Sequence, residues 1–254
     1  MRFLILAGAE DALAVRVAAE LIRRHSASGV AVVTPEELVL APRVRCRIPG
    51  TSGFTLHNGI VLEEQGIGVV FNRLRTAPVP HFQNARPADR DYAQMELFAL
   101  LLSWLASLRC QVVNRPSPQA LGGCAWSEFA WRHLAAQAGL PVPPMRLTSS
   151  SRRYALSGLP ALPLAQLGIG DFPAQYGPAP DGAVGVAVVM GDAVAGPLPD
   201  GWRQPAIALA RTAGVQLLAI YYAAIAGEIY CYHADPFPMT HAAEIAGYLE
   251  SLAA

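Results

Sequence analysis

The sequence predicts an α/β protein with an N-terminal parallel sheet and a C-terminal part built on antiparallel strands. The chain opens with an apolar run at residues 3–7, a helical repeat of apolar residues over 11–24 and a second apolar run at 30–33. This β-α-β order is typical of a parallel sheet covered by helices. Residues 183–195 and 215–234 each hold two apolar runs around a short turn, which predicts two antiparallel hairpins.

Further elements of the first half follow from local patterns. Residues 43–48 (RVRCRI) alternate basic with apolar side chains, as a half-exposed strand does. His57-Asn58-Gly59 separates two short apolar runs, and Asn-Gly in that position predicts a hairpin turn. The remaining patterns predict a strand over 68–74, an amphipathic helix over 89–108 and a strand over 111–114.

The second half begins with a predicted helix over 126–138, which Gly139 ends. The hairpin within 183–195 turns at Met190-Gly191-Asp192. An Ala-rich helix ends near residue 213, with Gly214 at its C-terminal cap, and leads into two strands joined by Ala226-Gly227. A helix over 240–252 closes the chain.

The length, composition and net charge of the chain limit the class of protein. With 254 residues and 53% hydrophobic composition, the chain can bury the core of one large domain or two small ones. Its net charge is zero and no basic run exceeds two residues, so we expect neither nucleic acid nor an anionic membrane as partner. The apolar runs are shorter than a bilayer span, and a cytoplasmic location is the expectation. The four cysteines lie far apart and are expected to be buried reduced thiols.

All 19 basic residues are arginine. The absence of lysine excludes Schiff-base catalysis and a P-loop lysine. Arginine also pairs with phosphate, but its planar fork does not replace a point-charge ammonium without a change in the site. A coding bias toward arginine accounts for the surface positions, whereas such a bias does not ordinarily remove an essential catalytic lysine.

The C-terminal stretch 205–239 resembles the core of the ATP-grasp carboxylate-amine ligases, in the branch of glutathione synthetase and the peptide glutamate ligases. In that family a helix of the type ALARALG leads into a strand ending GID, and the next strand ends E-x-N-P. This chain has ALARTAG, then a strand ending at Tyr221, then the segment HADP at 233–236. The resemblance implies that Tyr221, His233 and Asp235 occupy the positions of the family's magnesium ligands.

Those three residues suit magnesium poorly. The ion prefers hard oxygen ligands in octahedral geometry, whereas an imidazole and a phenol stand at two of the three positions. We therefore expect no cofactor; the alternative is that ATP and magnesium still bind.

The resemblance extends over most of the chain from about Gly68. The order of a helix, the strand with N-R-P, a second helix and the segment GLPVPP is similar to the family's first domain. Ser127 lies near a family lysine, Gln175-Tyr176 stands where the family has Q-E-Y, and the small nucleotide-covering lid would fall within 148–182, which is short and rich in Pro and Gly. We predict a first domain over 1–118 and a truncated ATP-grasp-like domain over 119–254.

Several residues are candidates for ligand binding. Arg73, Arg75, Arg86 and Arg90 surround a loop after a predicted strand, at the edge where open parallel sheets bind ligands, and could hold a carboxylate or phosphate. The alternative is a solvated loop paired with nearby acids. Gln175 is a further candidate from the resemblance.

Two other chemistries remain open around the last strand. His233 and Asp235 point to one face, so they could hold a transition metal together with His241, although such residues more often cap turns and helices. In a regular strand Cys231 faces the same way as His233, which permits a Cys-His nucleophile pair. The same alternation places Tyr230 and Tyr232 on the opposite face. These two and the Tyr221 and Tyr222 of the adjacent strand are aromatic residues that could fill a former cleft, as a plugged core or a protein-binding surface.

The leading functional hypothesis is a non-catalytic, degenerate ATP-grasp-like protein that binds a partner protein, a peptide or a small acidic ligand. The alternative is an active ATP-dependent carboxylate-amine ligase, in which Arg152 or Arg153 binds phosphate and Asp235 with Glu228 holds magnesium. A third possibility is a dedicated subunit of a biosynthetic or modification complex, and either homo- or hetero-oligomers are compatible with the sequence.

Overall fold

The computed structural model describes residues 1–45, 52–144, 146–147, 175–176 and 185–253. Contacts divide the chain into two compact units. The first contains residues 1–125, 214–217 and 236–254, and the second contains residues 126–213 and 218–235. The domain boundaries predicted from the sequence, 1–118 and 119–254, remain a prediction. The contacts group the chain differently, because residues 236–254 pack with the first unit.

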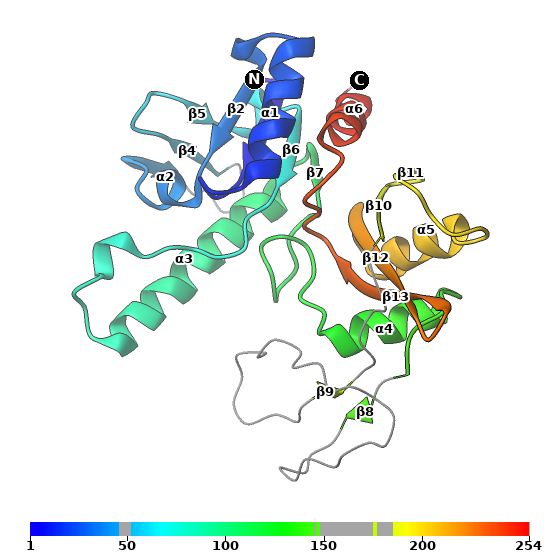
Figure 1. The fold of residues 1–254 in the computed structure, drawn as a ribbon. Helices are drawn as coiled ribbons and strands as arrows, with labels where there is room; N and C mark the ends of the chain where they lie inside the picture. The colour runs from blue at the N-terminus through cyan, green and yellow to red at the C-terminus, as the bar shows by residue number, and fades with distance from the viewer. Residues whose placement is uncertain (46–51, 145, 148–174, 177–184, 254) are drawn as a thin grey trace. The chain divides into compact units, whose positions relative to one another are not determined.

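A four-stranded parallel sheet forms the centre of the first unit, with strand order β2-β1-β6-β7 (Figure 1). Its strands are β1 (Phe3–Leu6), β2 (Val30–Val33), β6 (Val69–Asn72) and β7 (Gln111–Val113). β1 pairs in parallel with β2 and β6, and β6 pairs in parallel with β7. The predicted β-α-β opening and the parallel sheet are confirmed.

Helices α1, α6 and α2 lie in the same unit as this sheet. α1 (Ala12–Arg24) begins at Asp11, whose carboxylate accepts a hydrogen bond from the Ala14 amide at 3.0 Å. α6 (Ala242–Leu252) packs against α1, although the two lie at opposite ends of the sequence. α2 (Pro35–Val39) is a short helix that the sequence analysis missed. Its signal is a capping box, in which the Thr34 and Glu37 side chains each accept a hydrogen bond from the other's backbone amide.

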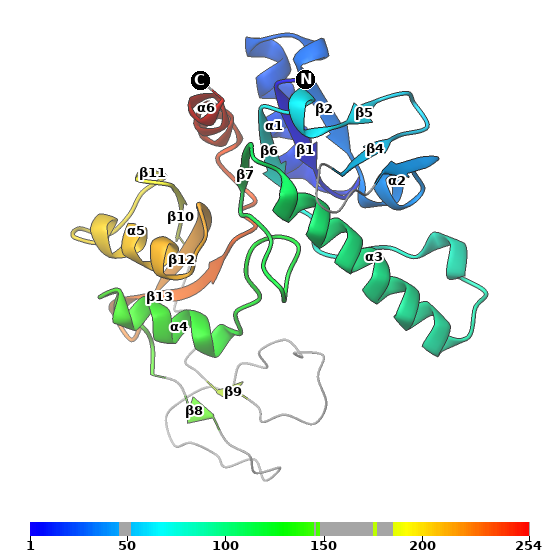
Figure 2. The same cartoon turned by 180° about the vertical axis from the view of Figure 1, so that it is seen from behind.

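α3 (Pro87–Ser107) is anchored through its C-terminal half. Leu101, Trp104 and Leu105 are buried there, and the Trp104 ring meets Phe54 edge-on at 4.9 Å. In the N-terminal half Tyr92 and Met95 are exposed, and this half projects from the sheets of its unit (Figure 1). Figure 2 shows the same projection from behind.

A small antiparallel sheet completes the first unit, with order β3-β4-β5. It consists of β3 (Arg43–Arg45), β4 (Gly53–Thr55) and β5 (Val61–Leu62). β4 and β5 form the hairpin predicted from Asn-Gly, and Gly59 takes the positive φ of 83° that the turn needs. The strand predicted over 43–48 is present as β3; residues 46–51, with Cys46, lie outside the described residues.

Two buried asparagines join the loops at the carboxyl ends of β6 and β7. Asn114 donates to the carbonyls of Leu217 and Pro236, at 3.0 and 2.9 Å, and accepts from the amides of Gln216 and Leu217. Asn72 donates to the carbonyls of Asn114 and Leu121. Asn114 thus uses both donors and both acceptor positions of its amide on backbone that is far away in the sequence.

The second unit is an antiparallel sheet of order β11-β10-β12-β13 with two helices. The strands are β10 (Gly185–Met190), β11 (Ala193–Ala195), β12 (Leu217–Ile225) and β13 (Glu228–Asp235), and the helices are α4 (Glu128–Gln137) and α5 (Arg203–Thr212). Both predicted hairpins are confirmed. β12 and β13 meet at Ala226 and Gly227, which have φ values of 51° and 81°, the left-handed pair of a type I′ turn.

The segment predicted to replace the lid, 148–182, lies outside the described residues except for Gln175 and Tyr176. These two form β9 (Gln175–Tyr176), which pairs antiparallel with β8 (Arg146–Leu147). Arg152 and Arg153 are also outside the described residues. In the described part of the chain, no helix combines the length and apolar character needed to cross a bilayer.

Candidate functional site

Tyr221, His233 and Asp235, which the resemblance predicts at the magnesium positions of the ATP-grasp ligases, lie on one face of the second unit's sheet. Tyr221 on β12 is directly opposite His233 on β13, and Ala219 is opposite Asp235. Residues opposite each other share a face, and Ala219 and Tyr221 are two residues apart on β12. The Tyr221 and His233 rings lie 5.6 Å apart. The structure thus brings together Tyr221, His233 and Asp235.

A β-bulge in β13 changes which residues share that face. The register shifts between Tyr221 and Tyr222, so that Tyr222 is opposite Cys231 and Tyr232 is the extra residue. Because Tyr221 and Tyr222 point to opposite faces, so do His233 and Cys231. The prediction that Cys231 and His233 share a face is wrong, because it assumed a regular strand.

The tyrosine prediction changes for the same reason. Tyr230 is opposite Ala223, which places it on the face of Tyr221 and His233 rather than on the opposite one. The phenol of Tyr222, on the other face, donates to the Pro197 carbonyl at 2.9 Å, and its ring meets Trp202 edge-on at 6.0 Å. The tyrosines therefore do not form one continuous aromatic surface.

Cys231 is not suited to nucleophilic catalysis. Burial, together with the nearby Glu128 carboxylate, raises the pKa of its thiol to about 12. A thiol with that pKa stays protonated at neutral pH, and its reactive thiolate is scarce. Cys110, Cys124 and Cys231 are free thiols, as expected, but Cys110 and Cys124 are only partly buried.

Helix α4 supplies the acid that engages His233. Ser127 caps the helix, since its hydroxyl accepts from the Ala130 amide at 3.2 Å, and Glu128 is the first helical residue. One carboxylate oxygen of Glu128 lies 2.5 Å from His233 Nδ1, and the other accepts from Arg132 Nε at 3.0 Å. Glu128 thus links an imidazole and a guanidinium, and we call Glu128, Arg132 and His233 the Glu128 cluster.

Arg132 is the most buried member of the Glu128 cluster. Its side chain is 5% exposed, compared with 13% for Glu128 and 39% for His233. Its guanidinium carbon lies 5.5 Å from the centre of the Tyr232 ring, the residue that the bulge inserts. Its Nη1 is buried and has no hydrogen-bond partner among the described residues. The buried Arg132 therefore packs against Tyr232, the residue that the bulge inserts into β13.

The cluster favours its own charged form. Burial raises the pKa of the Glu128 carboxyl, but the hydrogen bonds and charges of His233 and Arg132 outweigh this, so the pKa lies below its ordinary value of 4.5. Burial lowers the pKa of His233, but Glu128 and Asp235 outweigh it, so the pKa lies above its ordinary value of 6.5. Both shifts favour an ion pair between Glu128 and His233.

This arrangement fits a divalent cation poorly. The raised pKa of His233 favours its charged form, so a metal ion beside Glu128 would meet the imidazolium together with the buried Arg132 guanidinium. No group of three or more His, Cys, Asp or Glu side chains with metal-binding geometry occurs among the described residues. His241, proposed as a third ligand, belongs to the other unit and lies 3.6 Å from Glu244.

The carboxylate pair proposed for magnesium is also separated. Glu228 and Asp235 stand at opposite ends of β13. At about 3.4 Å per residue, the seven steps between them span about 24 Å. Glu228 instead accepts a hydrogen bond from the Tyr230 hydroxyl at 2.6 Å. One ion cannot be bound by both carboxylates.

The four arginines predicted to form one ligand site are placed differently in the first unit. Arg73 follows β6, is buried, and pairs with Asp11 at 2.6 Å between two phenylalanine rings. Arg75 is exposed and lies over the Phe237 ring at 4.1 Å. Arg86 pairs with Asp89 at the exposed start of α3, and Arg90 lies one turn further along it. The solvated-loop alternative describes Arg86; Arg73 is part of the packed interior.

Gln175, the remaining candidate, lies in β9 opposite Leu147. Sequence reasoning missed Glu128 and Arg132. Their signal was present, because a glutamate four residues before an arginine at a helix start predicts an i,i+4 pair. That Glu128 also reaches His233 depends on the packing of α4 against β13, which local patterns do not give.

Comparison with known proteins identifies the fold. No family model matches the sequence, and no curated protein sequence matches it. Among solved structures, the chain is similar to the ATP-grasp ligase PsnB complexed with precursor peptide PsnA2 and AMPPNP, with a TM-score of 0.74 and 16% identity, over 99% of this chain and 97% of that one.

Two further solved structures are similar in fold to this chain. The macrocyclase MdnC bound with precursor peptide MdnA, from Microcystis aeruginosa MRC, has a TM-score of 0.72 and 14% identity, over 99% of this chain and 100% of that one. A RimK domain ATP-grasp protein from Sphaerobacter thermophilus has a TM-score of 0.59 and 15% identity, with 99% of each chain covered. The chain has the ATP-grasp fold.

Proposed function

We propose that this protein is a non-catalytic ATP-grasp-like subunit that binds a peptide partner in a biosynthetic or modification system. The observation that carries the proposal is the use of His233, at a family magnesium position, as the partner of Glu128. An imidazole nitrogen suits magnesium poorly, because the ion prefers hard oxygen ligands, and the raised pKa of His233 favours the protonated ring, which has no free lone pair. The absence of any lysine, the cations that ATP-grasp enzymes use on the phosphates, supports the same proposal.

The peptide partner is proposed from the solved structures. PsnB and MdnC were each determined with a precursor peptide, and this chain matches nearly the full length of both. A fold that binds a peptide can keep that property after its catalytic residues change, because binding and chemistry depend on different residues. We therefore propose a peptide as partner, without turnover of ATP.

An active ATP-dependent ligase is the second candidate. The observation in its favour is that PsnB, of similar fold over nearly its whole length, was determined with AMPPNP. This candidate predicts that Asp235→Ala abolishes turnover and leaves the fold intact. It also predicts ATP hydrolysis that depends on the added peptide.

The test is a titration of the purified protein with each short peptide encoded beside its gene, with and without Mg·ATP. We expect one peptide to bind with an affinity that changes less than about twofold on adding Mg·ATP, and no ADP release. The proposal is overturned by peptide-dependent ADP release that Asp235→Ala removes, or by failure of every such peptide to bind. Size-exclusion chromatography of the coexpressed pair shows whether the complex is stable.

A further inference from the structure

The edge strand β3 carries two arginines on one face. Arg43 and Arg45 are two residues apart, so their side chains project to the same face, about 7 Å apart along the strand. Both are exposed, as is Val44 between them. β3 is an outer strand of its sheet, and its outer side pairs with no strand in the described part of the chain. An edge strand presents backbone N–H and C=O groups that another chain can pair with.

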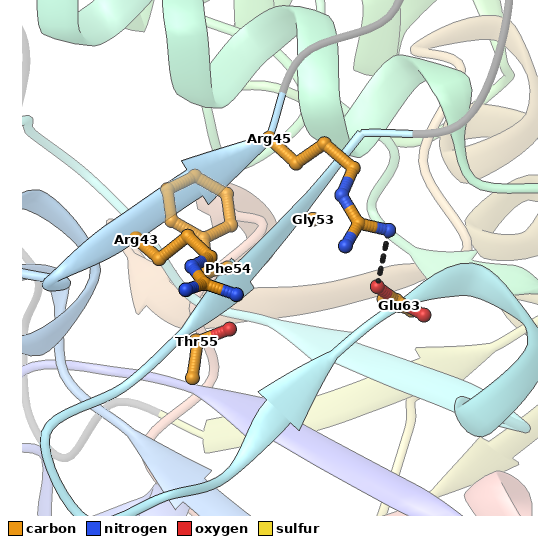
Figure 3. Close-up of a pocket in the computed structure, with 6 residues that line it drawn as sticks. All are labelled: Arg43, Arg45, Gly53, Phe54, Thr55 and Glu63. Carbon is orange, nitrogen blue, oxygen red and sulfur yellow. Dashed lines mark hydrogen bonds and ion pairs between the residues drawn. The ribbon is translucent and has the colours of Figure 1, made fainter.

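A shallow hollow lies beside these arginines. Figure 3 shows it bordered by Arg43 and Arg45 on β3, by Gly53 and Thr55 opposite them on β4, and by Glu63 after β5. Its volume is about 10 Å³, enough for about one water molecule or one carboxylate oxygen. A side chain at Gly53 would collide with the Leu62 carbonyl, since its Cβ would lie 2.7 Å from that oxygen. Glycine therefore keeps the hollow open.

The two arginines differ in their partners. Arg45 Nη1 lies 3.0 Å from the Glu63 carboxylate, whereas Arg43 has no ion pair among the described residues. The side chains of Arg45 and Glu63 are 53% and 42% exposed, so this ion pair is weakened by solvent and exchanges readily. The Arg43 guanidinium can therefore pair with a ligand directly, and the Arg45 guanidinium can leave Glu63 at small cost.

The sheet beneath is rigid enough to receive a ligand. Phe54, between Gly53 and Thr55 on β4, is 2% exposed and packs edge-on against the buried Trp104 of α3. Leu62, opposite Phe54 on β5, is fully buried. The backbone that positions Arg43 and Arg45 is thus fixed by the core of its unit, which lowers the ordering cost of binding.

We propose that β3 binds an extended acidic peptide segment as a fourth strand, with carboxylates at positions i and i+2. An added strand has the same repeat of about 7 Å for alternate residues, so two such carboxylates face Arg43 and Arg45. The carboxylate opposite Arg43 makes a new pair, and the one opposite Arg45 replaces Glu63.

Charge complementarity selects this partner over two others. A second copy of the chain, paired edge to edge through β3, would place arginine opposite arginine, which is destabilising. A nucleic acid would need a wider basic surface than two arginines on a chain of zero net charge. The proposal concerns the first unit alone and does not depend on the proposed function of the second.

The test uses a fluorescein-labelled peptide of alternating Glu and Val flanked by Thr, and fluorescence anisotropy with the full chain. We expect a Kd of about 1 mM or tighter. Arg43→Gln is expected to weaken binding about fivefold, and Glu63→Gln to strengthen it about two- to fivefold, because it frees Arg45 and removes a competing carboxylate. Arg203→Gln, an exposed arginine on α5, is the charge-matched control and leaves binding unchanged.

Two further probes separate strand pairing from simple charge attraction. A peptide of the same composition with its glutamates adjacent, and one with alternate backbone amides N-methylated, are each expected to bind at least fivefold more weakly. The proposal is overturned if either binds as well as the first peptide, if Arg43→Gln has no effect, or if no binding occurs at 1 mM. Tighter binding of a single-stranded oligonucleotide of equal charge, or dimerisation lost on changing Arg43, overturns it as well.

Discussion

Replacement of Glu128 by glutamine is the most informative perturbation of the Glu128 cluster. The change keeps the shape of the side chain but removes the charge that Arg132 and His233 share. Arg132 is 5% exposed and then retains its charge without a counter-ion. Removing one partner of a buried ion pair costs about 3 to 5 kcal/mol. Because Glu128 is 13% exposed, we expect the low end, about 3 kcal/mol.

Urea unfolding followed by circular dichroism measures this loss, with hydrogen exchange of the α4 amides as the readout local to the second unit. Glu20→Gln is the matched control. Glu20 also forms i,i+3 and i,i+4 pairs with arginines, but on the surface of α1, where solvent screens the pairs and only a small loss of stability is expected. If Glu128→Gln costs no more than Glu20→Gln, the Glu128 cluster does not stabilise the second unit.

The cluster also predicts a pH dependence with two limbs. The pKa of Glu128 is lowered in the folded protein, so its contribution is present above 4.5 and is lost as pH falls through the folded pKa. The pKa of His233 is raised, so its contribution is present below 6.5 and is lost as pH rises through the folded pKa. The stability difference between wild type and Glu128→Gln should therefore be largest between about pH 4.5 and 6.5. A difference that is flat with pH would contradict the pairing.

Three further predictions concern the fold and the thiol. Asn114→Ala should destabilise by about 3 kcal/mol or more, because it removes four hydrogen bonds to backbone groups, three of them buried, whereas Asn84→Ala, on the surface, should cost under about 0.5 kcal/mol. Gly227→Ala should destabilise by about 1 kcal/mol, since its φ is 81°, and Gly66→Ala should not; both are read from urea midpoints. Cys231 should resist iodoacetamide in the native protein at pH 8 and react once unfolded, as mass spectrometry of the alkylated peptide would show.

The order of elements could be predicted from sequence because each rests on a local pattern. The β-α-β opening follows from hydrophobic periodicity, the β4–β5 hairpin from Asn-Gly, and the β12–β13 turn from Ala226-Gly227. The sequence analysis missed α2 because five residues are too few to show a helical repeat of apolar side chains. Its capping box is the signal that could have identified it. The ATP-grasp fold was expected from the order of motifs, and solved structures confirm it.

The candidate site could be predicted only in part. The family positions Tyr221, His233 and Asp235 share a face, as the resemblance implied. The bulge at Tyr232 was not predictable, because one inserted residue changes the face of its neighbours without altering the apolar pattern. The arrangement of the arginines could not be predicted for a different reason: closeness in sequence does not determine whether a side chain turns inward to Asp11, as Arg73 does, or outward to solvent, as Arg86 does.

We propose that an internal ion pair stands in place of metal binding at the second unit's sheet. Calorimetric titration of the wild-type protein with Mg·AMPPNP tests it most directly, alongside a variant that restores the family's ligands through Tyr221→Asp, His233→Glu and Asp235→Asn. We expect no heat of binding from the wild type at nucleotide concentrations up to about 1 mM, which corresponds to a binding free energy weaker than about −4 kcal/mol. Saturable magnesium-dependent binding by the wild type, reduced by Asp235→Ala, would contradict the claim.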